Sequence, residues 1–199
     1  MNTDQSLSVG FADPVHGAQE AFRRVLDALS RPGRAFTLDS NTSTSNLGPA
    51  MAQLLLALTD DDTPVWWQQH DSVAAQWLRF HTGASIAESP SGAAFAVSLD
   101  APGLPALSMF AAGTAAAPEH STTLLVEVPS FDAGPAVEWR GPGIQDMQSV
   151  RIAGLPEGFW LQWQANHAAF PQGVDIVFTC ANAVLGLPRT TRVRRLESV

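Results

Sequence analysis

The chain has 199 residues, 45% of them hydrophobic and 15% charged, and its formal net charge at pH 7 is −8. The apolar fraction is large enough for a buried core, which excludes a disordered chain, and the acidic balance excludes a protein that wraps nucleic acid, because such binding depends on a basic surface. All 11 Lys and Arg positions are arginine, so the sequence lacks the amine that Schiff-base chemistry and the phosphate loop of nucleoside triphosphatases require.

The sequence shows neither a signal peptide nor a membrane span. Residues 1–13 are polar, without a basic patch followed by a hydrophobic stretch, and no apolar run approaches the ~18 residues that a membrane span requires. Cys180 is the only cysteine, which excludes an intrachain disulfide and is typical of a reducing compartment. We therefore expect a cytoplasmic protein with a polar N-terminal tail at 1–13 and a single domain at 14–199.

The first predicted element is a helix over 14–31. Asp13 is placed to cap it, Pro14 suits its first turn, and Pro32 with Gly33 ends it. Apolar residues at three- and four-residue steps predict the buried face of this helix. These residues are Ala18, Phe22, Val25, Leu26 and Leu29, with Glu20, Arg23, Arg24 and Asp27 on the outside.

The remaining elements mix helices with strands. A leucine-rich helix over 49–58 has apolar residues almost all round, so we expect it to be buried on more than one side. Ala181 and Asn182 separate two strands so closely that the strands should form an antiparallel hairpin. We expect a mixed sheet covered by helices, an α/β fold, rather than a regular βαβ repeat. The other predicted segments are a strand at 35–38, a loop at 40–46, a strand at 64–67, a helix at 72–81, strands at 94–99 and 122–128, two strands within 136–153 around Gly141-Pro142-Gly143, a helix late in 156–169, and strands at 174–180 and 183–187.

No catalytic or metal-binding constellation is apparent. Cys180 shares its strand face with Val174, Ile176 and Phe178, so we expect a buried and inert thiol. The five histidines show no pair at metal-ligand spacing on one helical turn. The sequence therefore predicts no catalytic residue, metal or cofactor, although an enzyme that uses Cys180 or a histidine on a nucleotide stays open as the alternative.

Two segments are candidates for binding. The string Arg189-Thr190-Thr191-Arg192 offers guanidinium and hydroxyl donors without a negative charge, which suits a phosphate or phosphonate oxyanion. Arg79 and His81, beside aromatic residues at the end of the third predicted helix, are second candidates. The alternative for the string is that its arginines pair with acidic residues at a subunit surface, since structural ion pairs are commoner than ligand sites.

Several strings together resemble one family. They are 22–29 (FRRVLDAL) with Pro32-Gly33, 54–66, 77–84 (WLRFHTGA), 141–144, and 170–193, which contains LPRTTRV. In this order they are similar to PhnH, a subunit of the bacterial carbon-phosphorus lyase system, over roughly 18–193. Agreement is weaker over 40–50 and 85–120.

The resemblance implies an accessory role in the use of organic phosphonates, in a complex with the PhnG, PhnI and PhnJ subunits, which forms ribose 1-phosphonate 5-triphosphate from ATP and a phosphonate. It also implies a homodimer and a three-layer α/β fold like that of pyridoxal-phosphate-dependent transferases. A chain without lysine cannot form the internal aldimine of those enzymes, so we expect the cofactor to be absent. The family carries over no catalytic residue. Two alternatives are a stand-alone hydrolase or transferase and a scaffold without a ligand.

Overall fold

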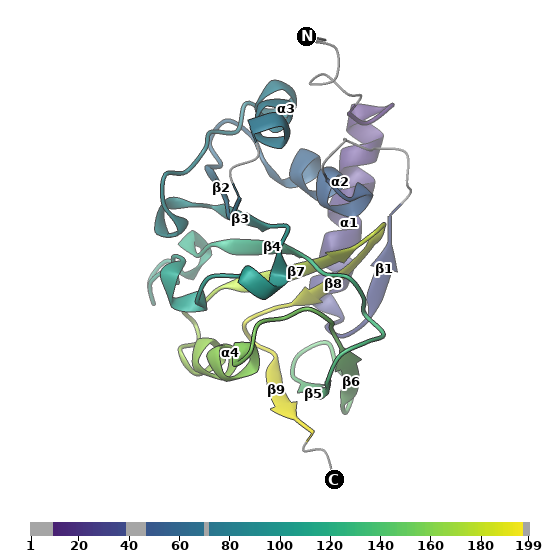
Figure 1. The fold of residues 1–199 in the computed structure, drawn as a ribbon, viewed down its shortest axis with the longest axis vertical. Helices are drawn as coiled ribbons and strands as arrows, with labels where there is room; N and C mark the ends of the chain where they lie inside the picture. The colour runs from purple at the N-terminus through teal and green to yellow at the C-terminus, as the bar shows by residue number, and fades with distance from the viewer. Residues whose placement is uncertain (1–9, 39–46, 70–71, 197–199) are drawn as a thin grey trace.

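The computed structural model describes residues 10–38, 47–69 and 72–196. Within these ranges a six-stranded mixed sheet crosses the middle of the molecule, in the order β1-β8-β7-β4-β3-β2 (Figure 1). The four strands from β7 to β2 are parallel, whereas β8 runs antiparallel to both β7 and β1. The strands are β1 (Ala35–Thr37), β2 (Val65–Trp67), β3 (Phe95–Ser98), β4 (Thr123–Glu127), β7 (Asp175–Cys180) and β8 (Ala183–Leu187).

A second sheet of three antiparallel strands has the order β6-β5-β9. Its strands are β5 (Ala136–Arg140), β6 (Gln148–Arg151) and β9 (Arg192–Arg195). The two strands predicted around Gly141-Pro142-Gly143 are confirmed, and so is the hairpin at Ala181 and Asn182. The sequence did not predict β9, because Val193 is its one apolar residue and four residues are too few to show alternation.

Helices cover both faces of the central sheet, which confirms the predicted α/β class. The helices α1, α2 and α3 lie on one face, and α4 lies with the second sheet on the other (Figure 1). Alternating residues of β7 separate the two cores: Val177 belongs to the first, while Ile176 and Phe178 belong to the second. The helices are α1 (Pro14–Ser30), α2 (Pro49–Leu58), α3 (Ser72–Thr82) and α4 (Phe159–Ala168), with short 3-10 turns η2 (Pro90–Gly92), η3 (Ala101–Gly103), η4 (Leu107–Met109) and η5 (Pro118–His120).

Several local predictions are confirmed. The Asp13 carboxylate accepts hydrogen bonds from the backbone N–H groups of Val15 (3.2 Å) and His16 (3.1 Å), so it caps α1. The helix α2 has the predicted bounds, and its residues 50–55 are all buried. The predicted loop at 40–46 lies outside the described residues. No helix in the described ranges is both long and apolar enough to cross a membrane.

The predicted buried face of α1 is wrong in part. Val25 is buried as expected, but Phe22 and Leu26 are 46% and 50% exposed, and the fully buried positions are Ala21 and Ala28. The cause is a close approach of β8. A Cβ atom added to Gly186 would lie 2.6 Å from the carbonyl carbon and oxygen of Ala28. The sheet and the helix are therefore too close for large side chains between them, and α1 turns its alanines inward.

We predict that Gly186→Ala lowers the free energy of unfolding by about 1–3 kcal/mol, because the new methyl group must push α1 away from β8. Gly92→Ala is a matched control, since its Cβ would meet only the Ser89 hydroxyl, at an ordinary 3.5 Å. Chemical denaturation of both variants measures the difference. Equal stability of the two variants would contradict the account of the α1 face.

Candidate functional site

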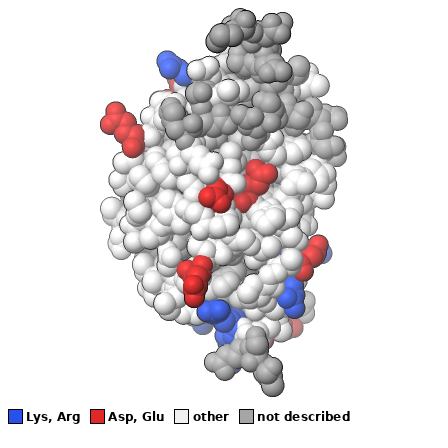
Figure 2. All heavy atoms as spheres, viewed as in Figure 1, with Lys and Arg blue, Asp and Glu red and all other residues white. Residues whose placement is uncertain are grey.

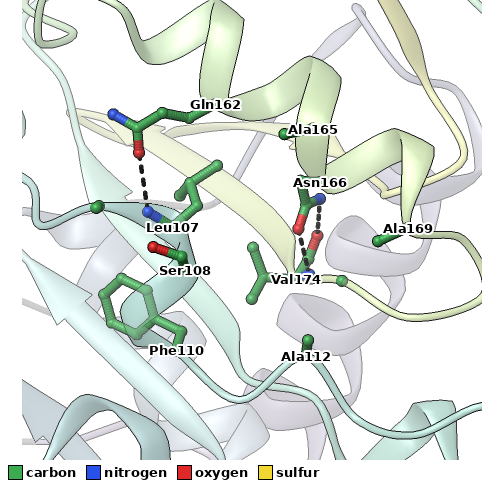
Figure 3. A pocket seen from close by; sticks show the side chains of 11 residues that line it. Leu107, Ser108, Phe110, Ala112, Gln162, Ala165, Asn166, Ala169 and Val174 are labelled. Carbon is green, nitrogen blue, oxygen red and sulfur yellow. Dashed lines mark hydrogen bonds between the residues drawn. The ribbon is translucent and has the colours of Figure 1, made fainter.

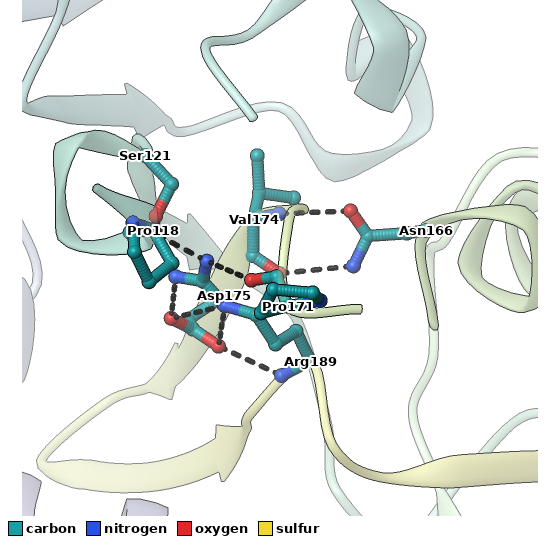
Figure 4. Close-up of polar contacts among 7 residues, drawn as sticks. All are labelled: Pro118, Ser121, Asn166, Pro171, Val174, Asp175 and Arg189. Carbon is teal, nitrogen blue, oxygen red and sulfur yellow. Dashed lines mark hydrogen bonds and ion pairs between the residues drawn. The ribbon is translucent and has the colours of Figure 1, made fainter. Parts of the chain in front are cut away.

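Arg189 lies between β8 and β9 and is bound to Asp175, the first residue of β7 (Figure 4). Its Nε is 3.2 Å from Oδ1 and 3.1 Å from Oδ2 of Asp175, and its backbone N–H donates to the same Oδ1 at 2.7 Å. The two side chains are only 12% and 23% exposed. This forked pair is therefore a largely desolvated ion pair inside the chain.

The remaining donors of Arg189 also have partners. Nη1 lies 3.0 Å from the carbonyl oxygen of Pro118 and 3.2 Å from that of Pro171. Nη2 donates to the hydroxyl of Ser121 and to Asp175. A guanidinium has five N–H groups, and the acceptors of this chain suffice for all five. Arg189 was predicted either to bind an oxyanion or to pair with an acidic residue. The geometry matches the ion pair, and its acidic partner lies within the chain itself.

Thr191 is also directed inward. It is fully buried, its backbone N–H donates to the Pro188 carbonyl at 2.8 Å, and its own carbonyl accepts from the indole N–H of Trp163 at 2.9 Å. The neighbouring residues Thr190 and Arg192 instead line a surface hollow. The predicted binding string is therefore divided, with residues 189 and 191 inside and residues 190 and 192 at the surface.

We call this cavity of about 560 Å³ the arginine hollow. Strand register builds it, because Arg140 of β5 lies directly opposite Arg192 of β9. The turn after Arg140 also contributes. Gly141 has a φ of +147°, and a Cβ at this position would lie 2.9 Å from the carbonyl oxygen of Thr190. Its lining includes Arg140, Gly141, His167, Phe170, Thr190 and Arg192.

His167 adds a ring nitrogen to the arginine hollow. Its Nδ1 lies 2.8 Å from the carbonyl oxygen of Arg189. Because a carbonyl oxygen only accepts, Nδ1 carries the hydrogen, and Nε2 is the ring nitrogen that remains for a ligand. Sequence reasoning missed both His167 and Arg140. No local pattern marks either residue, since the packing of α4 and the pairing of β5 with β9 bring them to the hollow.

Arg79 and His81 are not brought together with the arginine hollow. Both lie on α3, on the opposite face of the central sheet from α4 and the second sheet (Figure 1). The ring of His81 packs edge to face with Trp77 and Phe80, at centroid distances of 5.2 and 5.1 Å. The two groups of predicted binding residues therefore cannot contact one small ligand.

The second sheet carries a basic face in an acidic protein. Arg192 and Arg194 of β9 share this face with Arg140 of β5 and Arg151 of β6, and Glu138 is the acidic residue among them. Figure 2 shows arginine side chains gathered at the end of the molecule where Figure 1 places these strands. In a chain with a net charge of −8, this face carries a local excess of positive charge, which favours an anion.

Cys180 lies at the end of β7 and is partly buried, not fully buried as predicted. Its thiol is 3.5 Å from the carbonyl oxygen of Pro129. Burial raises the pKa of this thiol, and the negative charges of Glu127 and Asp132 raise it further. Reactive cysteines need a cationic environment that lowers the pKa, so these surroundings disfavour the thiolate that a nucleophile requires.

A second cavity, of about 440 Å³, lies between α4 and the segment around η4 (Figure 3). Two of its polar side chains, Gln162 and Asn166, are already bonded. Gln162 Oε1 accepts from the backbone N–H of Leu107 at 2.9 Å, and the Asn166 amide bonds both backbone groups of Val174 at 3.0 and 2.8 Å. The rest of the lining is mostly alanine and other apolar groups. This cavity suits an apolar group, and its lining offers the Ser108 hydroxyl but no carboxylate, imidazole, thiol or guanidinium.

We predict that Arg189→Met lowers the free energy of unfolding by about 3 kcal/mol, because the carboxylate of Asp175 is left without its partner in a largely buried position. Arg192→Met, at an exposed position of the same segment, should change it by less than about 0.5 kcal/mol. Urea denaturation of the two variants tests the division of the string. A small loss for Arg189→Met would show that the ion pair is not structural.

We also predict slow alkylation of Cys180 in the folded chain. Since its pKa lies above the ordinary 9.0, less than half of the folded thiol should be ionised at pH 9.0, where an unfolded thiol is half ionised. The measurement is the rate of iodoacetamide labelling against pH, with the chain unfolded in urea as the control. Fast labelling at neutral pH in the folded state would restore the nucleophile hypothesis.

Comparison with known proteins gives the family. The family described as "Bacterial phosphonate metabolism protein (PhnH)" matches residues 9–194. The chain is 41% identical over 194 residues to "Alpha-D-ribose 1-methylphosphonate 5-triphosphate synthase subunit PhnH" of Rhizobium meliloti (strain 1021), covering 96% of this chain and 97% of that protein. It is 30% identical over 184 residues to "Putative C-P lyase subunit protein HtxG" of Stutzerimonas stutzeri, covering 88% and 85%. The chain belongs to the PhnH family of bacterial phosphonate metabolism proteins.

Proposed function

We propose that this chain is an accessory subunit of a carbon-phosphorus lyase system, needed to form a ribose 1-phosphonate 5-triphosphate in the catabolism of organic phosphonates. One observation carries the proposal. The similarity to the synthase subunit PhnH of Rhizobium meliloti extends over 96% of the chain, so it includes both sheets and the arginine hollow. A shared segment alone would support only a shared fold.

The chain contributes to this reaction without supplying catalytic groups of its own. The absence of lysine, the protonated state favoured for Cys180 and the internal ion pair of Arg189 all support this part of the proposal. They weigh against the alternative of a stand-alone hydrolase or transferase that uses the thiol. An active site for the reaction would then be supplied by other subunits.

We propose PhnG, PhnI and PhnJ as the partners of the chain in the cytoplasm, with a homodimer and a fold related to pyridoxal-phosphate-dependent transferases. A row of exposed apolar side chains on α1 supports protein contacts. Val15, Phe22 and Leu26 are 69%, 46% and 50% exposed, and their spacing of seven and four residues places them along one stripe of the helix. Exposed apolar rows of this kind mark interaction sites.

The proposal includes a phosphate-bearing ligand. Of the four residues Arg189-Thr190-Thr191-Arg192, we propose Thr190 and Arg192 as its contacts, because these two line the arginine hollow. Arg189 and Thr191 would then act by holding the string in place, and Arg79 with His81 would belong to a separate surface. The competing hypothesis is a scaffold that binds no ligand. Ligand titration distinguishes the two hypotheses.

The function can be tested in a bacterium that grows on methylphosphonate and from which the gene for its own PhnH has been deleted. This chain is expressed in the deletion strain. We predict that this chain restores growth when methylphosphonate is the phosphorus source, and that a tagged chain co-purifies with PhnG, PhnI and PhnJ. Growth on inorganic phosphate is the control, because it does not need the complex. A stable, soluble chain that neither restores growth nor co-purifies would refute the proposed function.

A further inference from the structure

Arg140 and Arg192 form an unusual cross-strand pair. They are direct partners in the antiparallel register of β5 and β9, so their side chains are neighbours on one face. Both are exposed. Among the described residues neither has an acidic group within ion-pair distance, whereas Arg24, Arg31 and Arg189 each have one. Two guanidiniums at directly opposite positions repel each other, and no carboxylate of the described residues forms an ion pair with either of them.

The adjacent pair on the same face is balanced. Glu138 and Arg194, two residues further along each strand, also lie directly opposite each other and carry opposite charges. The sheet therefore matches charge at one position and leaves two positive charges together at the next. The unmatched position is the one that lines the arginine hollow, while Arg194 is not part of its lining.

The surroundings of this pair suit a phosphorylated organic molecule. The Thr190 hydroxyl can donate a hydrogen bond to a phosphate oxygen, and Nε2 of the neutral His167 ring can accept one from a hydroxyl of the ligand. Phe170, 58% exposed, gives an apolar wall against which a sugar or base can lie. A volume of about 560 Å³ is within the range of pockets that hold molecules of nucleotide size.

We propose that the arginine hollow binds the phosphate group of a phosphate ester between Arg140 and Arg192, with the carbon-bearing part of the ligand against Phe170. A phosphate has several oxygens in a tetrahedral array, so it can accept forked hydrogen bonds from both guanidiniums at once. The ligand thereby neutralises a repulsion that exists in the free protein. The inference rests on the proposed function, which places the chain among proteins that handle phosphorylated substrates.

Calorimetric titration of the full chain with AMP, methylphosphonate and inorganic phosphate, at equal ionic strength, tests the proposal. AMP should bind more tightly than the other two, since only AMP can also use Phe170. Arg140→Gln and Arg192→Gln should each weaken AMP binding by at least about tenfold, because each removes a charge-assisted contact. Phe170→Ala should weaken AMP binding and leave the binding of inorganic phosphate unchanged. Equal affinity for AMP and phosphate would overturn the assignment of an organic ligand.

Arg194→Gln is the matched control. It removes the same charge from the same face of β9 but lies opposite Glu138 and outside the hollow, so AMP affinity should change by less than about twofold. An equal loss for Arg192→Gln and Arg194→Gln would mean a general basic surface and no site. Unchanged AMP binding by Arg192→Gln would overturn the proposal directly.

Stability without ligand supplies an independent measurement. At low salt, Arg192→Gln should not lower the melting temperature, because it relieves repulsion, whereas Arg194→Gln should lower it by removing an opposite-charge pair. A lower melting temperature for Arg192→Gln alone would show that Arg140 and Arg192 do not repel each other, which contradicts the proposal.

The two proposals fail in different ways. If the wild-type chain binds AMP through Arg140 and Arg192 but does not restore growth on methylphosphonate, the proposed function fails and the binding site stands. If the wild-type chain restores growth but shows no AMP binding that depends on these arginines, the family role stands and the binding site is refuted.

Discussion

The ion pair between Arg189 and Asp175 fixes the relation of the two sheets. Asp175 begins the central strand β7, and Arg189 stands three residues before β9, so the pair connects the large sheet to the entry of the small one. The same guanidinium binds the carbonyls of Pro118 and of Pro171, which lies in the segment that leads into β7. Three parts of the chain, at 118–121, 171–175 and 189, therefore meet at a single side chain whose charge is largely removed from water.

The position of the arginine hollow depends on this connection. Arg189 and Thr190 lie in a turn in which the Thr191 N–H donates to the Pro188 carbonyl, and this turn holds Arg189 and Thr191 inward while Thr190 and Arg192 line the hollow. The register of β9 on β5 then decides which residue stands opposite Arg192. Inward-facing residues thus alternate with residues that line the hollow over these four positions, so half of the predicted binding string serves the fold.

Local signals allowed much of the fold to be predicted from the sequence. The cap at Asp13, the bounds of α2 and the hairpin at Ala181 and Asn182 depend on neighbouring residues, and all three are confirmed. The buried face of α1 depended instead on Gly186, which lies far along the chain and whose missing side chain lets β8 approach. For the same reason the site was only partly accessible to prediction, because Arg140 and His167 reach Arg192 through strand register and helix packing, which no local pattern encodes.

The pairing of β1 with β8 has a consequence for how the chain is made. Ala35 lies opposite Leu185, so β1 is synthesised long before the strand with which it pairs. During translation β1 therefore has no strand to pair with until β8 is made. Such non-local contacts form late, because the long chain segment between the two strands must first be brought into a closed loop. We therefore expect β1 to remain without its strand partner, and accessible to chaperones, until β8 has been synthesised.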